Sequence, residues 1–203
     1  MPPALTWLVR HGQSAANAGL PSVLHADVPL TELGHRQAEA VAERVARPPD
    51  LVVVSPFARA RATAAPILAR WPATPTETWP IGELTYLSPA RCVGTTPEIR
   101  RPWIAEYWQR CDPDHLDGDD AETFRAFVAR LADFHRRLAA LDLDFVIAVG
   151  HGQFFRAYTV ALAAGFEASA RWMQDYRARE TAQPMANGEI IELSRGGTPA
   201  DLS

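Results

Sequence analysis

The chain has 203 residues, of which 47% are hydrophobic and 22% are charged. This composition is typical of a folded globular protein, and at this length a single domain over residues 1–203 with a full hydrophobic core is expected. The formal net charge of −4 argues against a nucleic-acid-binding surface, which would show an excess of basic residues, so any anion-binding site has to be local.

The cysteines and the amino-terminal residues indicate the cellular compartment. Cys92 and Cys111 lack both CxxC spacing and the neighbouring residues typical of a zinc site, so we expect reduced thiols in a cytoplasmic protein. Residues 1–4 do not begin a signal peptide, and no apolar stretch reaches the length that a bilayer-spanning helix requires. No membrane partner is therefore expected.

The first predicted element is an apolar strand over residues 5–9. It delivers Arg10 and His11 side by side, and the chain then breaks at Gly12, which allows close approach of the backbone. A short helical stretch over 14–17, capped by its first serine, is expected next. The first strand therefore ends in two groups that can carry positive charge.

A loop and an amphipathic helix follow this strand. The loop around 25–29 contains His25, which we expect near the opening of the site, where a surface role is favoured over a contact with substrate. Thr31 is expected to cap the next helix. The apolar residues over 35–45 recur at helical spacing on one face, so this helix is expected to cover a sheet.

The second predicted strand also leads to a cationic side chain. Residues 51–54 form an uninterrupted apolar run of the kind that parallel strands show when both of their faces are covered. Arg59 lies just beyond the end of this strand. The helix expected over 58–71 contains Pro66, which should kink it or begin a new segment.

A carboxylate and a long insertion follow. A short extended stretch over 74–80 delivers Glu83 to a loop. From 85 to 120 the sequence is rich in Pro, Arg, Trp and Asp, with one helical patch near 97–109. Because a long, weakly periodic insertion in a compact domain is usually functional or mobile, we expect a lid over about 85–120.

The rest of the chain contains the helix with the strongest apolar stripe and the third buried strand. The predicted elements are helices over 124–140, 154–164 and 167–179 and strands over 145–149 and 188–193. Asp119 or Asp120 is expected to cap the first of these helices. His151 follows the strand over 145–149. Strands and helices thus alternate along the chain, which predicts an α/β fold in the form of a three-layer α/β/α sandwich.

Three predicted strands end in side chains that are cationic or can become so, namely Arg10 with His11, Arg59, and His151. In an open α/β sheet, ligands bind in the crevice outside the carboxyl ends of the strands, so these side chains are expected to converge. Arginines bind phosphate through charged, bidentate hydrogen bonds. We therefore interpret the strand ends as a site for a phosphoryl group.

Phosphoryl transfer also needs a nucleophile and a proton source. A neutral His11 can attack through one ring nitrogen if a backbone carbonyl orients the other. His151 can donate to a phosphoryl oxygen as an imidazolium, and Glu83 can protonate the leaving alkoxide and then deprotonate water. The chain lacks the clustered spacing of metal-ligand motifs, so neither a metal nor a cofactor is expected.

These motifs resemble those of the histidine phosphatase superfamily, in its phosphoglycerate mutase-like branch 1. The blocks that carry the resemblance are LVRHGQS over 8–14 with Asn17, PLT over 29–31 with Gly34, SPFARA over 55–60, GEL over 82–84 and VGHG over 149–152. The resemblance implies a phosphohistidine on His11, Glu83 as acid and base, a phosphate pocket of Arg10, Arg59 and His151, and a supporting phosphate contact from Asn17. It also implies a mostly parallel sheet with one antiparallel edge strand, and no metal cofactor.

The leading interpretation is a metal-independent phosphomonoesterase that acts through His11. Two alternatives stay open: phosphoglycerate mutase-type phosphoryl transfer, and a phospho-ligand binding or regulatory module with little catalysis. The presence of a nucleophile and an acid argues against the binding module, because binding alone needs only the arginines. The expected partner is a small phosphorylated substrate of unspecified identity. The oligomeric state stays open, with a homodimer as one option.

Overall fold

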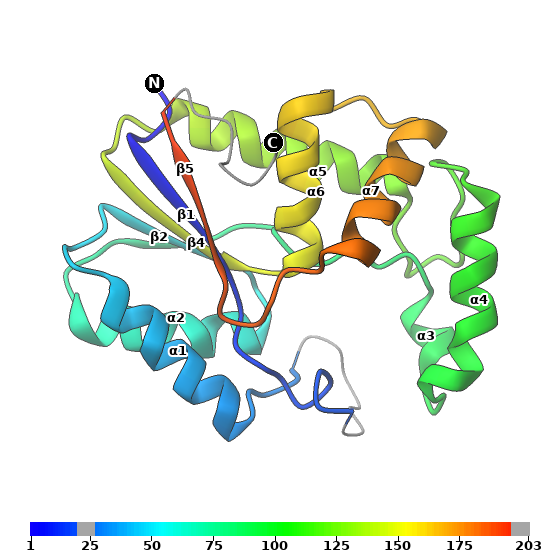
Figure 1. Cartoon of the computed structure of the whole chain (residues 1–203), viewed down its shortest axis with the longest axis horizontal. Coiled ribbons are helices and arrows are strands. Elements are labelled where there is room, and N and C mark those ends of the chain that lie inside the picture. Colours follow the sequence, from blue (N-terminus) through cyan, green and yellow to red (C-terminus); the bar gives the residue numbers. More distant parts are fainter. Residues whose placement is uncertain (20–26, 196–203) are drawn as a thin grey trace.

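The computed structural model describes residues 1–19 and 27–195, so His25 lies outside the described residues. The described elements are, in chain order, β1 (Leu5–Arg10), α1 (Glu32–Arg44), β2 (Leu51–Val54), α2 (Ala58–Arg70), β3 (Thr76–Thr78), α3 (Pro89–Cys92), α4 (Pro97–Arg110), α5 (Phe124–Ala140), β4 (Phe145–Gly150), α6 (Gly152–Ala164), α7 (Ala170–Ala182) and β5 (Ile190–Ser194). The sheet lies between two sets of helices (Figure 1), so the predicted three-layer α/β/α fold is confirmed.

A five-stranded sheet in the order β3-β2-β4-β1-β5 forms the middle layer. The strands β1, β2, β3 and β4 run parallel, and β5 pairs antiparallel with β1 at one edge. The prediction of a mostly parallel sheet with one antiparallel edge strand is therefore confirmed. All residues of β2 and β4 are buried, which explains why their sequences are continuous apolar runs.

The sheet has a hydrophobic core on each face, because successive residues of a strand point to opposite sides. Val9 and Val52 pack on the face that α1 and α2 cover. Leu8 and Val53 belong to the other core, which α5, α6 and α7 cover. Figure 1 shows the two helical layers on opposite sides of the strands. The carboxyl ends of the parallel strands are left at one edge between these layers.

The segment over 85–120 contains α3 in addition to α4, which occupies the expected helical patch. Trp108 of α4 attaches this segment to the core, since its ring centroid lies 6.3 Å from that of Phe124 and 6.0 Å from that of Tyr176. Beyond these aromatic contacts, α3 and α4 stand apart from the sheet (Figure 1). The inner end of the segment is therefore anchored, whereas the outer end projects.

The predicted cap of α5 was wrong. Thr123 caps this helix with its side chain, in place of Asp119 or Asp120. Asp120 instead accepts hydrogen bonds from Ser88 Oγ at 2.5 Å and from the Ala90 amide at 2.8 Å. The carboxylate is thus engaged by a segment about thirty residues earlier, and such a long-range contact leaves no local signal.

Two further local predictions differ from the structure. The stretch over 14–17 is a turn and not a helix, because Ser14 forms a β-bridge with Leu30 and its hydroxyl donates to Asn17 Oδ1 at 3.0 Å. The helix α2 runs as one element through Pro66 and does not restart there. In the first case, the contact of Ser14 with Leu30 overrides the local preference for a helix.

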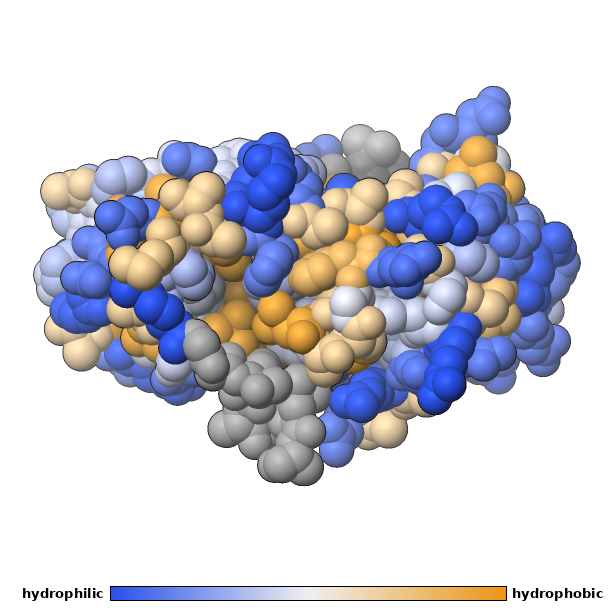
Figure 2. All heavy atoms as spheres, turned by 90° about the horizontal axis from the view of Figure 1, so that it is seen from above, coloured by the Kyte–Doolittle hydropathy of each residue, from blue (hydrophilic) through white to orange (hydrophobic). Residues whose placement is uncertain are grey.

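The described surface has no element suited to spanning a membrane. Within residues 1–19 and 27–195, no helix is both long enough and apolar enough to cross a bilayer. Figure 2 shows the face seen from above, on which apolar residues gather near the middle and hydrophilic residues dominate both ends. Hydrophilic residues lie around this central apolar area on the face shown.

Candidate active site

The register of the parallel strands brings the first and third strand ends together. Arg10 of β1 pairs with Gly150 of β4, so the residues that follow, His11 and His151, lie side by side. Their ring centroids are 5.0 Å apart. Because β2 pairs with β4, Ser55 and the beginning of α2 reach the same edge. The predicted convergence of the three strand ends is therefore observed in the geometry.

His11 is buried in a defined tautomeric state. Its Nδ1 lies 2.7 Å from the Gly12 carbonyl oxygen, which can only accept a hydrogen bond, so Nδ1 carries the hydrogen and Nε2 keeps its lone pair. Burial lowers the pKa of His11 to about 4, with the charges of Arg59 and Arg10 acting in the same direction and Glu83 opposing them. His11 is therefore neutral at pH 7, with a lone pair on Nε2.

The guanidinium of Arg59 lies between the two histidines. Its Nε donates to His11 Nε2 at 3.1 Å, and one of its terminal nitrogens lies 3.2 Å from His151 Nδ1. Burial lowers the pKa of Arg59, whereas the nearby carboxylate of Glu83 raises it, and a guanidinium stays charged at neutral pH in either case. A permanent positive charge therefore faces the candidate nucleophile.

His151 is held by residues that sequence reasoning missed. Its Nε2 lies 2.9 Å from Ser55 Oγ, and its ring meets that of Phe57 edge-on at 4.9 Å. The Arg59 guanidinium lies 4.8 Å from the centre of the same Phe57 ring. The signal that could have found Ser55 and Phe57 is their position in the same sequence block as Arg59.

Glu83 approaches Arg59 and His151 from the loop after β3. Its carboxylate oxygens lie 3.6 Å from Arg59 Nη2 and 3.9 Å from His151 Nδ1, and its side chain is 22% exposed, which allows proton exchange with solvent. Arg130 of α5 holds this loop by donating to the carbonyl oxygens of Gly82 at 3.1 Å and Glu83 at 3.4 Å. Sequence reasoning missed Arg130, because no motif distinguishes it on an amphipathic helix.

Arg10 is the last residue of β1 and directly precedes the buried His11. Its terminal nitrogen donates to the Met185 carbonyl oxygen. Its Nε is buried and has no hydrogen-bond partner in the described part of the chain. Gly152 packs against the side chain, since a Cβ at this position would lie 2.9 Å from Arg10 Cδ. Arg10 therefore keeps a buried donor that a ligand can satisfy.

Asn17 lies at the surface, unlike the buried residues His11, Arg59 and His151. Its Oδ1 accepts hydrogen bonds from Ser14 Oγ at 3.0 Å and from Asn187 Nδ2 at 3.2 Å. Asn187 also donates to the backbone carbonyl of His11 at 3.0 Å. The described side-chain contacts of Asn17 are thus with Ser14 of the loop that carries His11 and with Asn187, which itself contacts this loop. Sequence reasoning gave Asn187 no role, because it lies far along the chain next to β5.

The loop after β1 is fixed by very close backbone contacts. A Cβ on Gly12 would lie 2.3 Å from the carbonyl oxygen of Gly34, and a Cβ on Gly34 would lie 2.1 Å from that of Gln13. The amide of Gly12 also donates to Thr63 Oγ1 at 3.0 Å. Only glycine permits this approach, and the approach fixes the carbonyl that orients the His11 ring.

The same side chains also meet the distance requirement for a metal site. One ligand atom from each of His11, Glu83 and His151 lies within 4.8 Å of the others. However, the guanidinium of Arg59 lies against a ring nitrogen of each histidine, and its charge opposes a cation at this position. The arrangement therefore suits an anion better than a divalent metal ion.

The chain is similar in sequence and in fold to known proteins. Residues 6–177 match the profile of the histidine phosphatase superfamily (branch 1). The chain is 32% identical over 175 residues to an adenosylcobalamin/alpha-ribazole phosphatase of Salmonella typhi, with 82% of each chain covered. It is similar in structure to a mycobacterial glucosyl-3-phosphoglycerate phosphatase in complex with VO3, with a TM-score of 0.70, 26% identity, and 94% of this chain and 91% of that chain covered. The alpha-ribazole phosphatase of Shigella flexneri, 24% identical with a TM-score of 0.66, shares the fold over 93% of this chain and 89% of that chain.

Proposed function

Because the chain belongs to branch 1 of the histidine phosphatase superfamily, we propose that it is a phosphomonoesterase that hydrolyses a small phosphate ester through a phosphohistidine on His11. The observation that carries the proposal is the 3.1 Å hydrogen bond from Arg59 Nε to His11 Nε2. A phosphoryl group that enters here meets a nucleophilic lone pair and a fixed positive charge together. The relatives named above are phosphatases, which favours water over an alcohol as the final acceptor.

In the first step, the Arg59 Nε hydrogen bond passes from His11 Nε2 to a phosphoryl oxygen, and the freed lone pair of Nε2 attacks the phosphorus atom while the bond from phosphorus to the leaving oxygen breaks. Glu83, in its protonated form, gives its proton to this oxygen, so that an alcohol leaves and a phosphohistidine remains. His11 needs no prior deprotonation, because burial lowers its pKa to about 4. The Gly12 carbonyl holds Nδ1 and keeps Nε2 directed at the phosphorus.

In the second step, water replaces the histidine. Glu83, now a carboxylate, takes a proton from a water molecule whose oxygen attacks the phosphorus. The bond between phosphorus and Nε2 breaks, the lone pair returns to Nε2, and inorganic phosphate leaves. Glu83 ends the cycle protonated, as it began, so the protons balance.

The phosphate oxygens are held, in this proposal, by Arg10, Arg59, His151 and Asn17. Arg59 supplies the charge nearest to the nucleophile, and the unpartnered Nε of Arg10 supplies a further buried donor. His151 lies on the opposite side of Arg59 and completes this part of the pocket. Asn17 contributes its side-chain amide from the loop that carries His11.

We also propose that the reaction needs no metal and that residues 85–120 act as a lid. The guanidinium of Arg59 supplies the positive charge that a metal ion would otherwise bring to the phosphoryl group. The lid proposal is supported by the arrangement of the segment, which is attached through Trp108 at its inner end and projects at its outer end (Figure 1).

The experiment that tests this function is phosphoenzyme trapping. The enzyme is mixed with ³²P-labelled p-nitrophenyl phosphate, with and without a chelator, and quenched in alkali. We expect base-stable, acid-labile label on the wild-type enzyme in both conditions, and none on His11→Asn. The exposed His35 provides the matched control, since His35→Asn should label like the wild type.

Label retained by His11→Asn would reject the nucleophile. Loss of label in the chelator would reject metal independence. Transfer of the label to an added alcohol in preference to water would favour the mutase-type alternative.

A further inference from the structure

We propose that Arg130 of α5 and Glu122 are positioning residues for the reaction, because together they hold the carboxyl group of Glu83 where it can protonate the leaving oxygen. This inference rests on the proposed phosphomonoesterase function and adds two residues on which its acid step depends. Neither residue contacts the phosphoryl group in this proposal, so both act through Glu83.

The loop that carries Glu83 lacks the backbone pattern of regular secondary structure. Residues 80–86 belong to neither a helix nor a strand, so no sheet ladder or helical turn fixes their carbonyl groups. Ile81 and Leu84 are buried in the core and anchor the loop through their side chains. A general acid has to lie within hydrogen-bond reach of the leaving oxygen, so the backbone of Glu83 has to be fixed as well.

Arg130 binds three of these carbonyl groups. Its Nη1 donates to the carbonyl oxygens of Pro80 at 2.7 Å and Gly82 at 3.1 Å, and its Nη2 donates to that of Glu83 at 3.4 Å. The guanidinium is planar and rigid, so one group fixes the directions of several carbonyls at once. Arg130 therefore holds the stretch of backbone that leads to Glu83 and sets the position of its Cα.

Glu122 fixes the guanidinium in turn. Its carboxylate oxygens accept hydrogen bonds from Arg130 Nε at 2.6 Å and Nη2 at 2.7 Å, which is the bidentate geometry of a strong pair. The amide of Glu122 also donates to the Thr85 carbonyl at 2.8 Å, two residues after Glu83. The side chains of the pair are only 24% and 17% exposed, so solvent screens them less than a surface pair. Glu122 thus holds the loop through its backbone and through Arg130.

The loop that these two residues hold is packed against the buried centre. A Cβ on Gly82 would lie 3.0 Å from Phe57 Cε2, and the Phe57 ring meets that of His151 edge-on at 4.9 Å. The carboxylate of Glu83 lies 3.6 Å from Arg59 Nη2. A misplacement of about 1 Å can lower a catalysed rate about 100-fold. Release of the loop from Arg130 should therefore impair proton transfer by Glu83.

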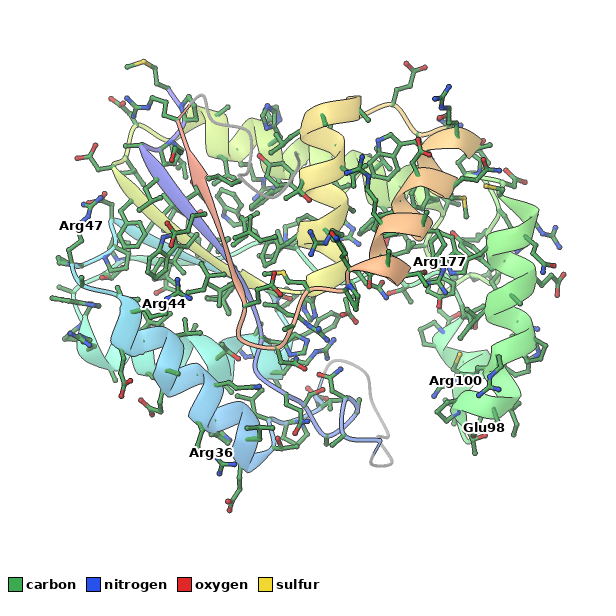
Figure 3. The ribbon with its side chains drawn as sticks, viewed as in Figure 1. Arg36, Arg44, Arg47, Glu98, Arg100 and Arg177 are labelled. Atoms are coloured by element: carbon green, nitrogen blue, oxygen red, sulfur yellow. The ribbon has the colours of Figure 1, made fainter. Side chains whose placement is uncertain are left out.

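Arg177 offers a comparison, because it also ties the 85–120 segment to the rest of the molecule. Its guanidinium lies 5.0 Å from the ring centre of Trp108, and Figure 3 shows it on the side of α7 that faces α4. Among the described residues, this contact is with α4 and not with a carbonyl of the Glu83 loop. Loss of Arg177 should loosen the segment without displacing Glu83.

The test compares kcat/KM for butyl phosphate and p-nitrophenyl phosphate, since this parameter reports the formation of the phosphoenzyme. Butoxide needs a proton from Glu83 in order to leave, whereas nitrophenolate does not. Arg130→Leu should lower kcat/KM for butyl phosphate by about 100-fold and leave that for p-nitrophenyl phosphate nearly unchanged. Glu122→Gln keeps the shape of its side chain and should lower the value for butyl phosphate by about tenfold, as for a hydrogen bond to a charged group.

Two controls and a double variant accompany this test. Arg177→Leu should keep the wild-type ratio between the two esters, and so should Arg136→Leu, which removes a 73% exposed arginine from the same helix as Arg130. In a Glu83→Gln background, Arg130→Leu should cause no further loss with butyl phosphate, because a residue that acts through Glu83 has no effect once the acid is gone.

The outcomes separate this inference from the proposed function. Equal losses for both esters in Arg130→Leu and Glu122→Gln would overturn the positioning role, and so would a further loss with butyl phosphate in the Glu83→Gln background. If Arg130→Leu does not fold, the ratio in Glu122→Gln decides. A wild type that forms a phosphoenzyme while neither variant changes the ratio would overturn the positioning role alone. Failure of the wild type to form a phosphoenzyme from either ester would overturn the proposed function.

Discussion

The buried centre at the strand ends and the segment over 85–120 are built from the same residue types in opposite ways. In the centre, His11, Arg59 and His151 are at most 3% exposed, and they contact one another directly. In the segment, charged residues pair mainly at the surface, for example Arg110 with Glu106 at 3.1 Å. Large apolar side chains such as Val93 and Ile99 are exposed there.

We infer from this difference that the buried centre is rigid and that the segment over 85–120 can change its position more easily. Backbone register fixes the centre, because adjacent parallel strands carry the histidines and a displacement of either would break the sheet. The segment is fixed mainly by aromatic contacts at its inner end and by surface ion pairs, which contribute little to stability. Chemistry is therefore expected to depend on the first region, and access of substrate on the second.

The largest expected effect comes from removing the central charge. Arg59→Leu should lower kcat/KM by about 1,000-fold, since it deletes the buried, charged donor of the proposed phosphate pocket. The control is Arg70→Leu, which removes an exposed arginine at the other end of the same helix and should change kcat/KM less than about twofold. A loss in Arg59→Leu no greater than that in the control would show that the centre does not perform the chemistry.

An intermediate effect is expected from the titration of His11. Since the fold holds the pKa of this residue at about 4, against 6.5 when unfolded, the unfolded chain binds the extra proton between these values. The stabilisation is complete above pH 6.5 and is lost as the pH falls toward 4, by about 3 kcal/mol in the free energy of unfolding.

Urea unfolding of the wild type and of His11→Asn at pH 7 and pH 4.5 measures this contribution. The wild type should lose more stability on acidification than the variant, which cannot titrate at this position. Equal losses would mean that His11 is not held neutral, and the proposed nucleophile would then lack its lone pair in mild acid.

The smallest effect is expected from the outer segment. Arg91 pairs with Asp117 and lies 4.1 Å from the ring centre of Trp103, with 38% of its side chain exposed. Arg91→Ala should lower the free energy of unfolding by about 1 kcal/mol or less, because solvent screens this pair. Hydrogen exchange within 88–117 should nevertheless become faster, whereas exchange in β1 and β4 should not change.

The exposed Arg101 provides the matched control, and Arg101→Ala should alter neither measurement. A global loss of stability in Arg91→Ala, with faster exchange in β1 and β4, would contradict the division into two regions.

Much of the architecture could be predicted from the sequence. The runs at 51–54 and 145–149 are apolar without interruption, a pattern typical of parallel strands covered on both faces, so they predict a parallel sheet. Arg10, His11 and His151 could likewise be predicted as neighbours, because they follow strands whose carboxyl ends share one edge. Both predictions depend on the pattern of apolar residues along the chain, which indicates where each strand lies and where it ends.

Only the tertiary structure decided which distant residues complete the site. Arg130 holds the loop of Glu83 from α5, although no local pattern marks this arginine. Asp120 was predicted from its position to cap α5, but its carboxylate accepts a hydrogen bond from Ser88 Oγ instead. The physical reason is the same in each case, because polar side chains select their partners by proximity in the folded molecule and leave no periodic trace along the chain.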